Sequence, residues 1–171
     1  MRKIITVVLL TLTMGVYAQN AQVTKIRQLY NNTKDMMANR SQFIPPENPS
    51  DELVVSSDYM APGAGPIKDV VHYYFSCDYD EVTGSPYYTP YFISRTHNCG
   101  AWDYYEEFLY DKDNLVFYYC KRGNDETRYY WGPKGLCHED IRGGRDMDDV
   151  FAMRLANDLM EAFNRLMNRE Y

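Results

Sequence analysis

The sequence predicts an α+β fold in which an antiparallel β-meander of about six strands packs against an N-terminal and a C-terminal helix. Two segments, 22–39 and 146–169, carry apolar side chains at helical spacing. Between them, apolar and polar residues alternate, and short turns rich in Gly, Asp, Asn and Pro interrupt the alternation. A chain of 171 residues is also long enough for one domain with a substantial core.

The N-terminus has the pattern of an export signal. A basic start, MRK, precedes an apolar run over residues 4–16 that is too short for a lasting membrane span. The run ends in small residues, with Ala18 at the position that an exporting peptidase reads; the alternative is a buried first strand. We expect a signal peptide over residues 1–18, a single α+β domain over 19–171, and a periplasmic or secreted location.

The first predicted helix, QVTKIRQLYNNTKDMMAN, places its apolar residues on one side and most of its charges on the other. The proline-rich connection SQFIPPENPSD at 41–51 then excludes regular structure. ELVVSSDYM at 52–60 is a candidate strand, and APGAGP at 61–66 is a second irregular joint.

The meander itself is predicted from alternation and turn chemistry. Strands are expected at 71–79, 87–97, 102–110, 115–121, 126–131 and 136–141. The joints EVTGSP, NCGA, DKDN, RGND and GPKG are short and contain the residues that hairpin turns require.

The C-terminal segment is the strongest helical pattern. Acidic residues crowd its first turn and arginines its last, which suits the helix dipole. One apolar stripe is expected from Met147, Val150, Phe151, Leu155, Leu159, Phe163, Leu166 and Met167. Such a stripe needs a sheet or a second helix to cover it.

Strand parity predicts two different sheet faces. If every hairpin is simple, Phe108 lies opposite Phe117 and Tyr119 lies opposite Tyr129. One face then collects an almost entirely apolar set beneath the C-terminal helix: Trp102, Tyr104, Phe108, Tyr110, Leu115, Phe117, Tyr119, Tyr129 and Trp131. The opposite face is mixed and is expected to be solvated or shallowly concave: Tyr105, Glu107, Leu109, Val116, Tyr118, Cys120, Arg128 and Tyr130.

The mixed face supplies the candidate binding residues Tyr105, Glu107, Tyr118, Arg128 and Tyr130. Rings and charged groups on one face can bind a glycan or a peptide by stacking and charge-assisted hydrogen bonds. The alternative is an ordinary set of exposed tyrosines with a cross-strand ion pair. We expect a non-catalytic binding or interaction module; the alternatives are a hydrolase-like enzyme with its site inside a curled sheet, or a structural component without a ligand.

Several functional classes are disfavoured. No signature of a known catalytic, phosphate-binding or calcium-binding motif occurs, so no catalytic residue and no cofactor is predicted. Cys137 and His138 are neighbours on a strand and point to opposite faces, which disfavours a nucleophile–base pair. The net charge of −6 without a basic stripe argues against nucleic acid, and no later apolar run is long enough for a membrane span.

The sequence contains four cysteines: Cys77, Cys99, Cys120 and Cys137. An even number in an exported chain favours two disulfides over a metal site, because the cysteines are widely spaced rather than in close pairs. The predicted strand levels favour the pairings Cys77–Cys137 and Cys99–Cys120, and no metal ligands are predicted.

The segment 104–131, YYEEFLYDKDNLVFYYCKRGNDETRYYW, resembles a pattern in small exported bacterial proteins with an aromatic-rich β-meander. In these proteins an acidic-aromatic strand, an Asp-x-x-Asn/Gly turn and a Glu-x-Arg-Tyr-Tyr strand recur. The resemblance implies export and an antiparallel sheet, and it implies no activity and no site residues.

Overall fold

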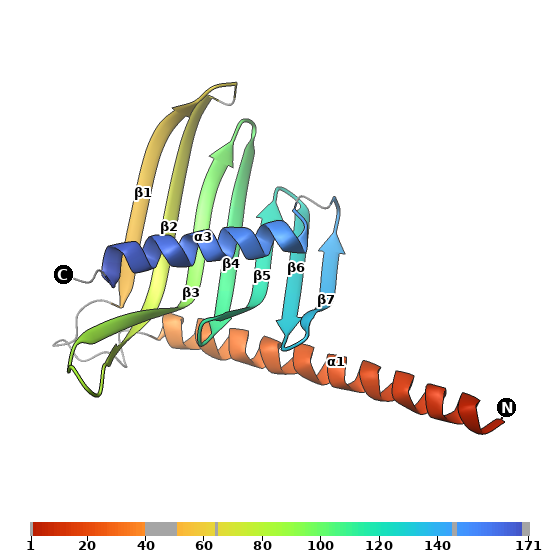
Figure 1. Cartoon of the computed structure of the whole chain (residues 1–171). Coiled ribbons are helices and arrows are strands. Elements are labelled where there is room, and N and C mark those ends of the chain that lie inside the picture. Colours follow the sequence, from red (N-terminus) through yellow and green to blue (C-terminus); the bar gives the residue numbers. More distant parts are fainter. Residues whose placement is uncertain (1, 40–50, 64, 145–146, 169–171) are drawn as a thin grey trace.

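The computed structural model describes residues 2–39, 51–63, 65–144 and 147–168, with side chains from residue 19 onward. Within these residues, seven antiparallel strands form one sheet in sequence order, and one helix lies on each face (Figure 1). The helices are α1 (Arg2–Ala38) and α3 (Asp149–Met167). The strands are β1 (Glu52–Ala61), β2 (Gly65–Tyr79), β3 (Pro86–Cys99), β4 (Trp102–Asp111), β5 (Asn114–Arg122), β6 (Asp125–Gly132) and β7 (Gly135–Arg142). The predicted fold class is confirmed, and the candidate strand at 52–60 is β1.

The hairpin turns lie where turn residues were expected. Gly100 opens the β3–β4 turn with a φ of 61°, and Gly123 opens the β5–β6 turn with a φ of 57°. Both values lie in the left-handed region that a side chain disfavours, so glycine is the natural residue there. The predicted proline-rich connection at 41–51 lies almost wholly outside the described residues. The described part of the chain contains no helix with the length and apolarity that a membrane crossing requires.

Helix α3 is defined by its N-terminal cap and by a narrow buried stripe. The Asp148 carboxylate accepts a hydrogen bond from the Phe151 amide at 2.7 Å, which satisfies one of the free donors at the helix start. The buried positions are Ala152, Ala156, Leu159 and Phe163. The predicted stripe was partly wrong, because it omitted Ala152 and Ala156 and included Val150, which is 71% exposed.

Three strands each contain a β-bulge, which inserts one residue without a partner. The inserted residues are Tyr91 in β3, Val116 in β5 and Cys137 in β7. A bulge places two successive residues on the same side of the strand and bends it. The regular alternation assumed from the sequence therefore breaks at these three positions.

The bulge at Val116 overturns the predicted register of β5. Leu109 pairs with Phe117, and Tyr118 pairs with Tyr129, one residue away from the predicted partners. Above the bulge the two faces of β5 are exchanged. Tyr118 and Cys120 turn toward α3, whereas Phe117 and Tyr119 turn toward α1.

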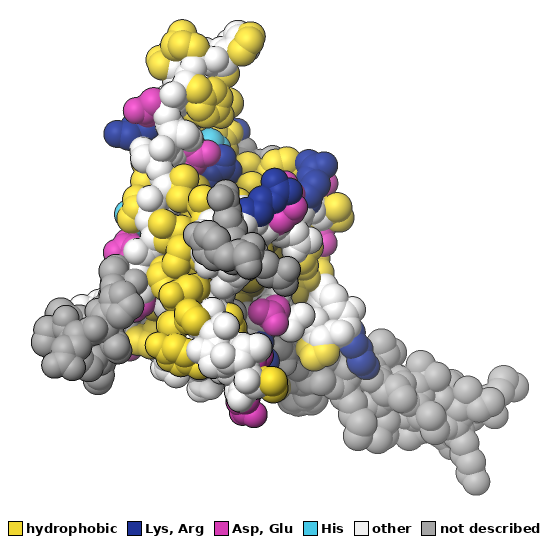
Figure 2. Space-filling view, turned by 60° about the vertical axis from the view of Figure 1, so that its left-hand side comes forward, with side chains coloured by type: hydrophobic (Ala, Val, Ile, Leu, Met, Phe, Trp, Pro, Cys, Tyr) yellow, Lys and Arg dark blue, Asp and Glu magenta, His cyan; other side chains and the backbone are white. Residues whose placement is uncertain are grey.

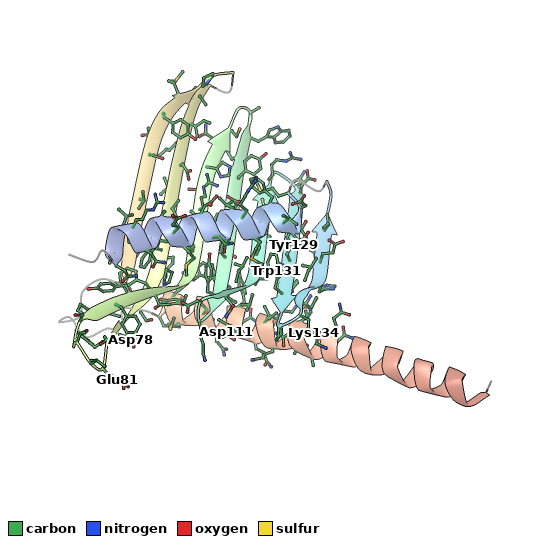
Figure 3. All side chains as sticks on the ribbon, viewed as in Figure 1. Asp78, Glu81, Asp111, Tyr129, Trp131 and Lys134 are labelled. Atoms are coloured by element: carbon green, nitrogen blue, oxygen red, sulfur yellow. The ribbon has the colours of Figure 1, made fainter. Side chains whose placement is uncertain are left out.

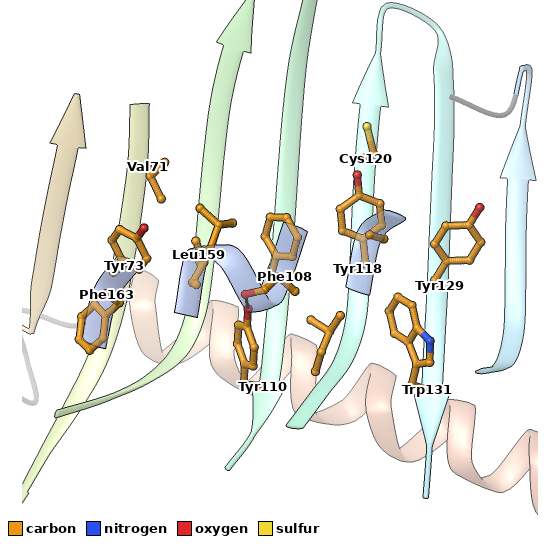
Figure 4. Close-up of a cluster of buried hydrophobic side chains, with 14 of the residues drawn as sticks. Val71, Tyr73, Phe108, Tyr110, Tyr118, Cys120, Tyr129, Trp131, Leu159 and Phe163 are labelled. Atoms are coloured by element: carbon orange, nitrogen blue, oxygen red, sulfur yellow. Dashed lines mark hydrogen bonds between the residues drawn. The ribbon is translucent and has the colours of Figure 1, made fainter. Parts of the chain in front are cut away.

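The larger core lies between the sheet and α3 (Figure 4). Its buried rings come from four strands, β2, β4, β5 and β6, and from α3, and Tyr118 stacks on Tyr129 with ring centroids 6.1 Å apart. Figure 3 shows Tyr129 and Trp131 beside the N-terminal end of α3. The Tyr129 hydroxyl donates to the Met147 carbonyl at 2.7 Å. Each buried ring contributes about 1.5–3 kcal/mol, and this hydroxyl also fixes the position of the helix start.

A second core lies on the opposite face, beneath α1. It contains Val23, Ile26, Phe92, Leu109, Phe117 and Tyr130. The face that was expected to meet solvent is therefore largely covered where α1 crosses it. The β1–β2 hairpin extends beyond both helices, and its tip carries the exposed side chains Tyr59 and Met60 (Figures 1 and 2).

The predicted disulfides are wrong, because none of the four cysteines forms a disulfide. Cys77 lies in β2 and Cys137 in β7, near opposite edges of the sheet. At about 4.8 Å per strand their backbones are roughly 24 Å apart, whereas a disulfide requires Cα atoms within about 7 Å. Cys99 lies at the outer end of β3, and Cys120 is buried two strands away on the α3 side.

Candidate functional site

Four of the predicted binding residues lie on the α1 side of the sheet: Tyr105, Glu107, Arg128 and Tyr130. Tyr118 does not belong with them, because the bulge at Val116 turns it into the core beneath α3, where it is 0% exposed. Tyr119 occupies the position predicted for Tyr118. Helix α1 adds side chains that the sheet pattern alone did not reveal.

Glu107 is the centre of the hydrogen bonding on this side. Its carboxylate is almost completely buried and accepts from three donors. The Tyr30 hydroxyl lies 2.6 Å from Oε2, and the Tyr105 hydroxyl and Lys34 Nζ lie 2.6 Å and 2.9 Å from Oε1. The three donors satisfy both oxygens of this buried carboxylate.

The two tyrosines that bind Glu107 remain protonated. Burial, followed by the hydrogen bond to Glu107, raises the pKa of both Tyr30 and Tyr105 far above the usual range. Each hydroxyl therefore donates at any physiological pH. Because Tyr30 and Lys34 are four residues apart on α1, one helix turn supplies two of the three donors.

Arg128 forms the opposite wall of this region. Its Nη2 donates to Glu126 at 2.7 Å, and its guanidinium lies 4.9 Å from the centre of the Tyr119 ring. This hydrogen bond lowers the pKa of Glu126. The buried Nη1 has no hydrogen-bond partner among the described residues, since the Asp140 carboxylate is 3.8 Å away. Both terminal nitrogens of the Arg128 guanidinium therefore face carboxylates of the sheet, Glu126 and Asp140.

These side chains enclose a pocket of about 350 Å³ between α1 and strands β4–β6. Its walls are Arg27, Tyr30 and Asn31 from α1, and Glu107, Phe117, Tyr119, Arg128 and Tyr130 from the sheet. We call it the Arg–Tyr pocket. The Arg27 guanidinium lies 5.4 Å from the centre of the Tyr130 ring and forms no ion pair with any described residue. The pocket thus combines a buried anion that is already neutralised with two cations that face aromatic rings.

The sequence contained a signal for the two α1 residues of the site that were not predicted. Tyr30 and Lys34 stand on the helix predicted at 22–39, at a spacing that brings both to one side. That signal does not show which strand the helix crosses, because packing of a helix across a sheet is a long-range property. Tyr119 was missed for a different reason, since it follows from the bulge.

A second group of ionisable residues lies on the α3 side. Glu106 is 0% exposed, accepts the Tyr118 hydroxyl at 2.7 Å and accepts Arg95 Nη1 at 3.2 Å. Arg95 also forms a bidentate ion pair with Asp69, with distances of 2.9 Å and 2.7 Å. Burial raises the pKa of Glu106, although the hydrogen bond from Tyr118 and the Arg95 charge oppose that shift.

His97 stands beside this group. Its ring stacks on Tyr104 at 4.7 Å, and its Nδ1 lies 3.5 Å from Glu106 Oε2 without a hydrogen-bond partner among the described residues. Burial, with a further contribution from the Arg95 charge, lowers the pKa of His97 to about 4. The imidazole is therefore neutral near pH 7.

Comparisons with known family models, curated proteins and solved structures found no match to this chain. Among the described residues, no group of three or more His, Cys, Asp or Glu side chains is placed to hold a metal ion.

Proposed function

We propose that this protein is an exported, non-catalytic binding protein whose Arg–Tyr pocket takes a small ligand bearing a carboxylate. The observation that carries the proposal is the pairing of Arg27 and Arg128 with the rings of Tyr130 and Tyr119 in one pocket. A guanidinium is a preferred partner for a carboxylate, and an aromatic ring beside it accommodates the body of a sugar or a side chain.

The charge of the pocket supports an anionic ligand. Lys34 balances Glu107 at 2.9 Å, and Glu126 balances Arg128 at 2.7 Å. Arg27 has no acidic partner among the described residues. A ligand carboxylate would therefore bind at Arg27.

The same pocket is poorly suited to acid–base catalysis. Its one lining carboxylate, Glu107, already accepts three hydrogen bonds from the protein, so both of its oxygens are occupied. Tyr30 and Tyr105 have raised pKa values and hold their protons. These groups position a ligand rather than exchange protons with it.

The hydrolase-like alternative has one observation in its favour, namely the buried Glu106 with its raised pKa beside Arg95 and His97. A carboxyl group with a raised pKa is a candidate general acid. Glu106, however, contributes to none of the pockets described on the surface of the chain. A substrate would have to displace part of the α3-side core to reach it.

The proposal is tested by calorimetric titration of small sugar acids and acidic dipeptides, each compared with its methyl ester. The carboxylates should bind, and esterification should weaken binding about tenfold or more, because the ion pair with Arg27 is lost. Arg27→Gln should have the same effect without unfolding the protein, since Arg27 is exposed.

The matched control is Arg154→Gln, which removes an exposed arginine from α3 on the opposite side of the sheet. This variant should bind like the parent protein. Equal binding of acids and esters, or equal loss in both arginine variants, would overturn the proposal. A protein that binds none of these ligands would favour the structural component.

A further inference from the structure

A second hollow lies on the same sheet face as the Arg–Tyr pocket. It has a volume of about 820 Å³ and is lined by residues of β2, β3, β4 and β5. The side chains that matter here are Lys68, Thr96, Asn98, Tyr105 and Lys121. We call it the upper hollow, because it lies toward the ends of the strands that extend beyond the helices in Figure 1.

Strand parity places these side chains on the α1 side. Lys68 shares the parity of Tyr74 in β2, and Thr96 and Asn98 share that of Phe92 in β3 above its bulge. Tyr105 and Lys121 are register partners on β4 and β5. Lys68, Thr96, Tyr105 and Lys121 therefore project from the face that carries the Arg–Tyr pocket, whereas the Asn98 side chain is hydrogen-bonded to the β2 backbone at Pro66 and Lys68.

The two hollows adjoin across one pair of tyrosines. Tyr105 lines the upper hollow and Tyr119 lines the Arg–Tyr pocket, and their rings meet edge to face at 6.3 Å. Tyr105 also donates to Glu107, which lines the Arg–Tyr pocket. Lys121 is two residues from Tyr119 on the same side of β5, a rise of about 6.6 Å.

The strand register places Asp58 opposite Lys68 and Glu126 opposite Lys121, but neither pair forms an ion pair. Lys68 and Lys121 are exposed and form no ion pair with the described residues, and the same is true of Arg27 at the other end. The single acidic side chain in the upper hollow is Asp103. In a chain with a net charge of −6, this row of cations beside tyrosine rings favours an extended anionic ligand.

The length of the path and the nature of its floor define the ligand further. From Arg128 on β6 to Lys68 on β2 is four strand spacings, or roughly 19 Å. The floor is a sheet face whose backbone donors and acceptors are already paired in the ladders. A peptide laid across it would leave its own amides with few partners, whereas sugar hydroxyls need only side-chain partners such as Thr96.

We infer that the Arg–Tyr pocket and the upper hollow form one continuous groove for an acidic oligosaccharide built from uronic acid units. This inference rests on the proposed function and extends it. One uronate binds in the Arg–Tyr pocket at Arg27. Later units of the oligosaccharide cross the Tyr119–Tyr105 pair and place their carboxylates near Lys121 and Lys68.

The test compares galacturonate with its linear tetramer by ligand-observed NMR and calorimetry on the purified protein. The tetramer should bind at least about tenfold more tightly than the monomer. Lys68→Gln and Lys121→Gln should each weaken tetramer binding about two- to fivefold and leave monomer binding unchanged. Lys134→Gln, in the exposed β6–β7 turn, is the matched control and should change neither.

The outcomes separate this inference from the proposed function. Equal affinity for monomer and tetramer would overturn the groove and leave the carboxylate pocket standing. Absence of binding to both, together with no binding of any other carboxylate, would overturn both proposals. A tetraglutamate peptide that binds as tightly as the tetrauronate would overturn the assignment to a sugar.

Discussion

The hydroxyl of Tyr118 gives the sharpest test of the register of β5. Tyr118 and Glu106 are both 0% exposed, and the hydroxyl donates to the carboxylate at 2.7 Å. Tyr118→Phe keeps the ring and removes this donor. A hydrogen bond to a charged group contributes about 1.5–3 kcal/mol, so the variant should lose about 2 kcal/mol of unfolding free energy.

In a chain of this size that loss corresponds to a drop of about 4–8 °C in melting temperature. The loss should also depend on pH. Because burial holds the pKa of Glu106 above its unfolded value, its charged form destabilises the fold as pH rises through that pKa. Removing the Tyr118 hydroxyl raises this pKa further, so the variant should be weakened more at pH 8 than at pH 4.

Calorimetry and urea unfolding at both pH values measure the effect. Tyr87→Phe is the control, because Tyr87 is 47% exposed and its loss of a hydroxyl should cost less than about 0.5 kcal/mol. In a Glu106→Gln background the Tyr118→Phe change should cost only about 1 kcal/mol. A variant as stable as the parent at pH 8 would refute the register, since Tyr118 would then meet solvent.

Three further predictions concern the rest of the chain. The pKa of His97 is held near 4, below the ~6.5 of an unfolded histidine, so the unfolding free energy should fall by at most about 3 kcal/mol between pH 6.5 and 4. His97→Gln should remove this part of the pH dependence of stability, as measured by urea unfolding at each pH. Phe117→Ala should cost about 3–5 kcal/mol and speed hydrogen exchange in α1, because Phe117 packs on Tyr30 at 5.0 Å; a loss below 1 kcal/mol would contradict this packing. Thiol titration of the unfolded, unreduced protein should find all four cysteines reactive, with Cys120 protected in the native protein; no reactive thiol would restore the disulfide interpretation.

The fold was predictable because its local signals agree. Turn residues at 98–101 and 111–114 mark the hairpins, and the capping Asp148 with its apolar stripe marks α3. The register of β5 was not predictable in the same way. Successive tyrosines, as at Tyr118-Tyr119 and Tyr129-Tyr130, supply a ring to both faces, so alternation carries almost no information about which face is which.

The candidate site was predictable only in its sheet residues. Glu107 and Arg128 were identified because charged side chains stood among rings on one face. The burial of Glu107 was not predicted, because it requires hydrogen-bond donors, and two of its three donors come from α1. Nothing local to the strand records that a helix will cross it, so a mixed face was taken for a solvated one.

The inserted residue Val116 connects the core to the candidate site. Without it, regular alternation from Leu115 would direct Phe117 and Tyr119 toward α3 and Tyr118 toward α1. Glu106 would then lose the hydroxyl that it accepts inside the core. The Arg–Tyr pocket would lose the ring that packs on Tyr30 and the ring beneath Arg128. One bulge thus supplies both the Tyr118 hydroxyl to Glu106 and the Phe117 and Tyr119 rings to the pocket. The stability of the α3-side core and the shape of the pocket therefore depend on the same register, and neither can change alone.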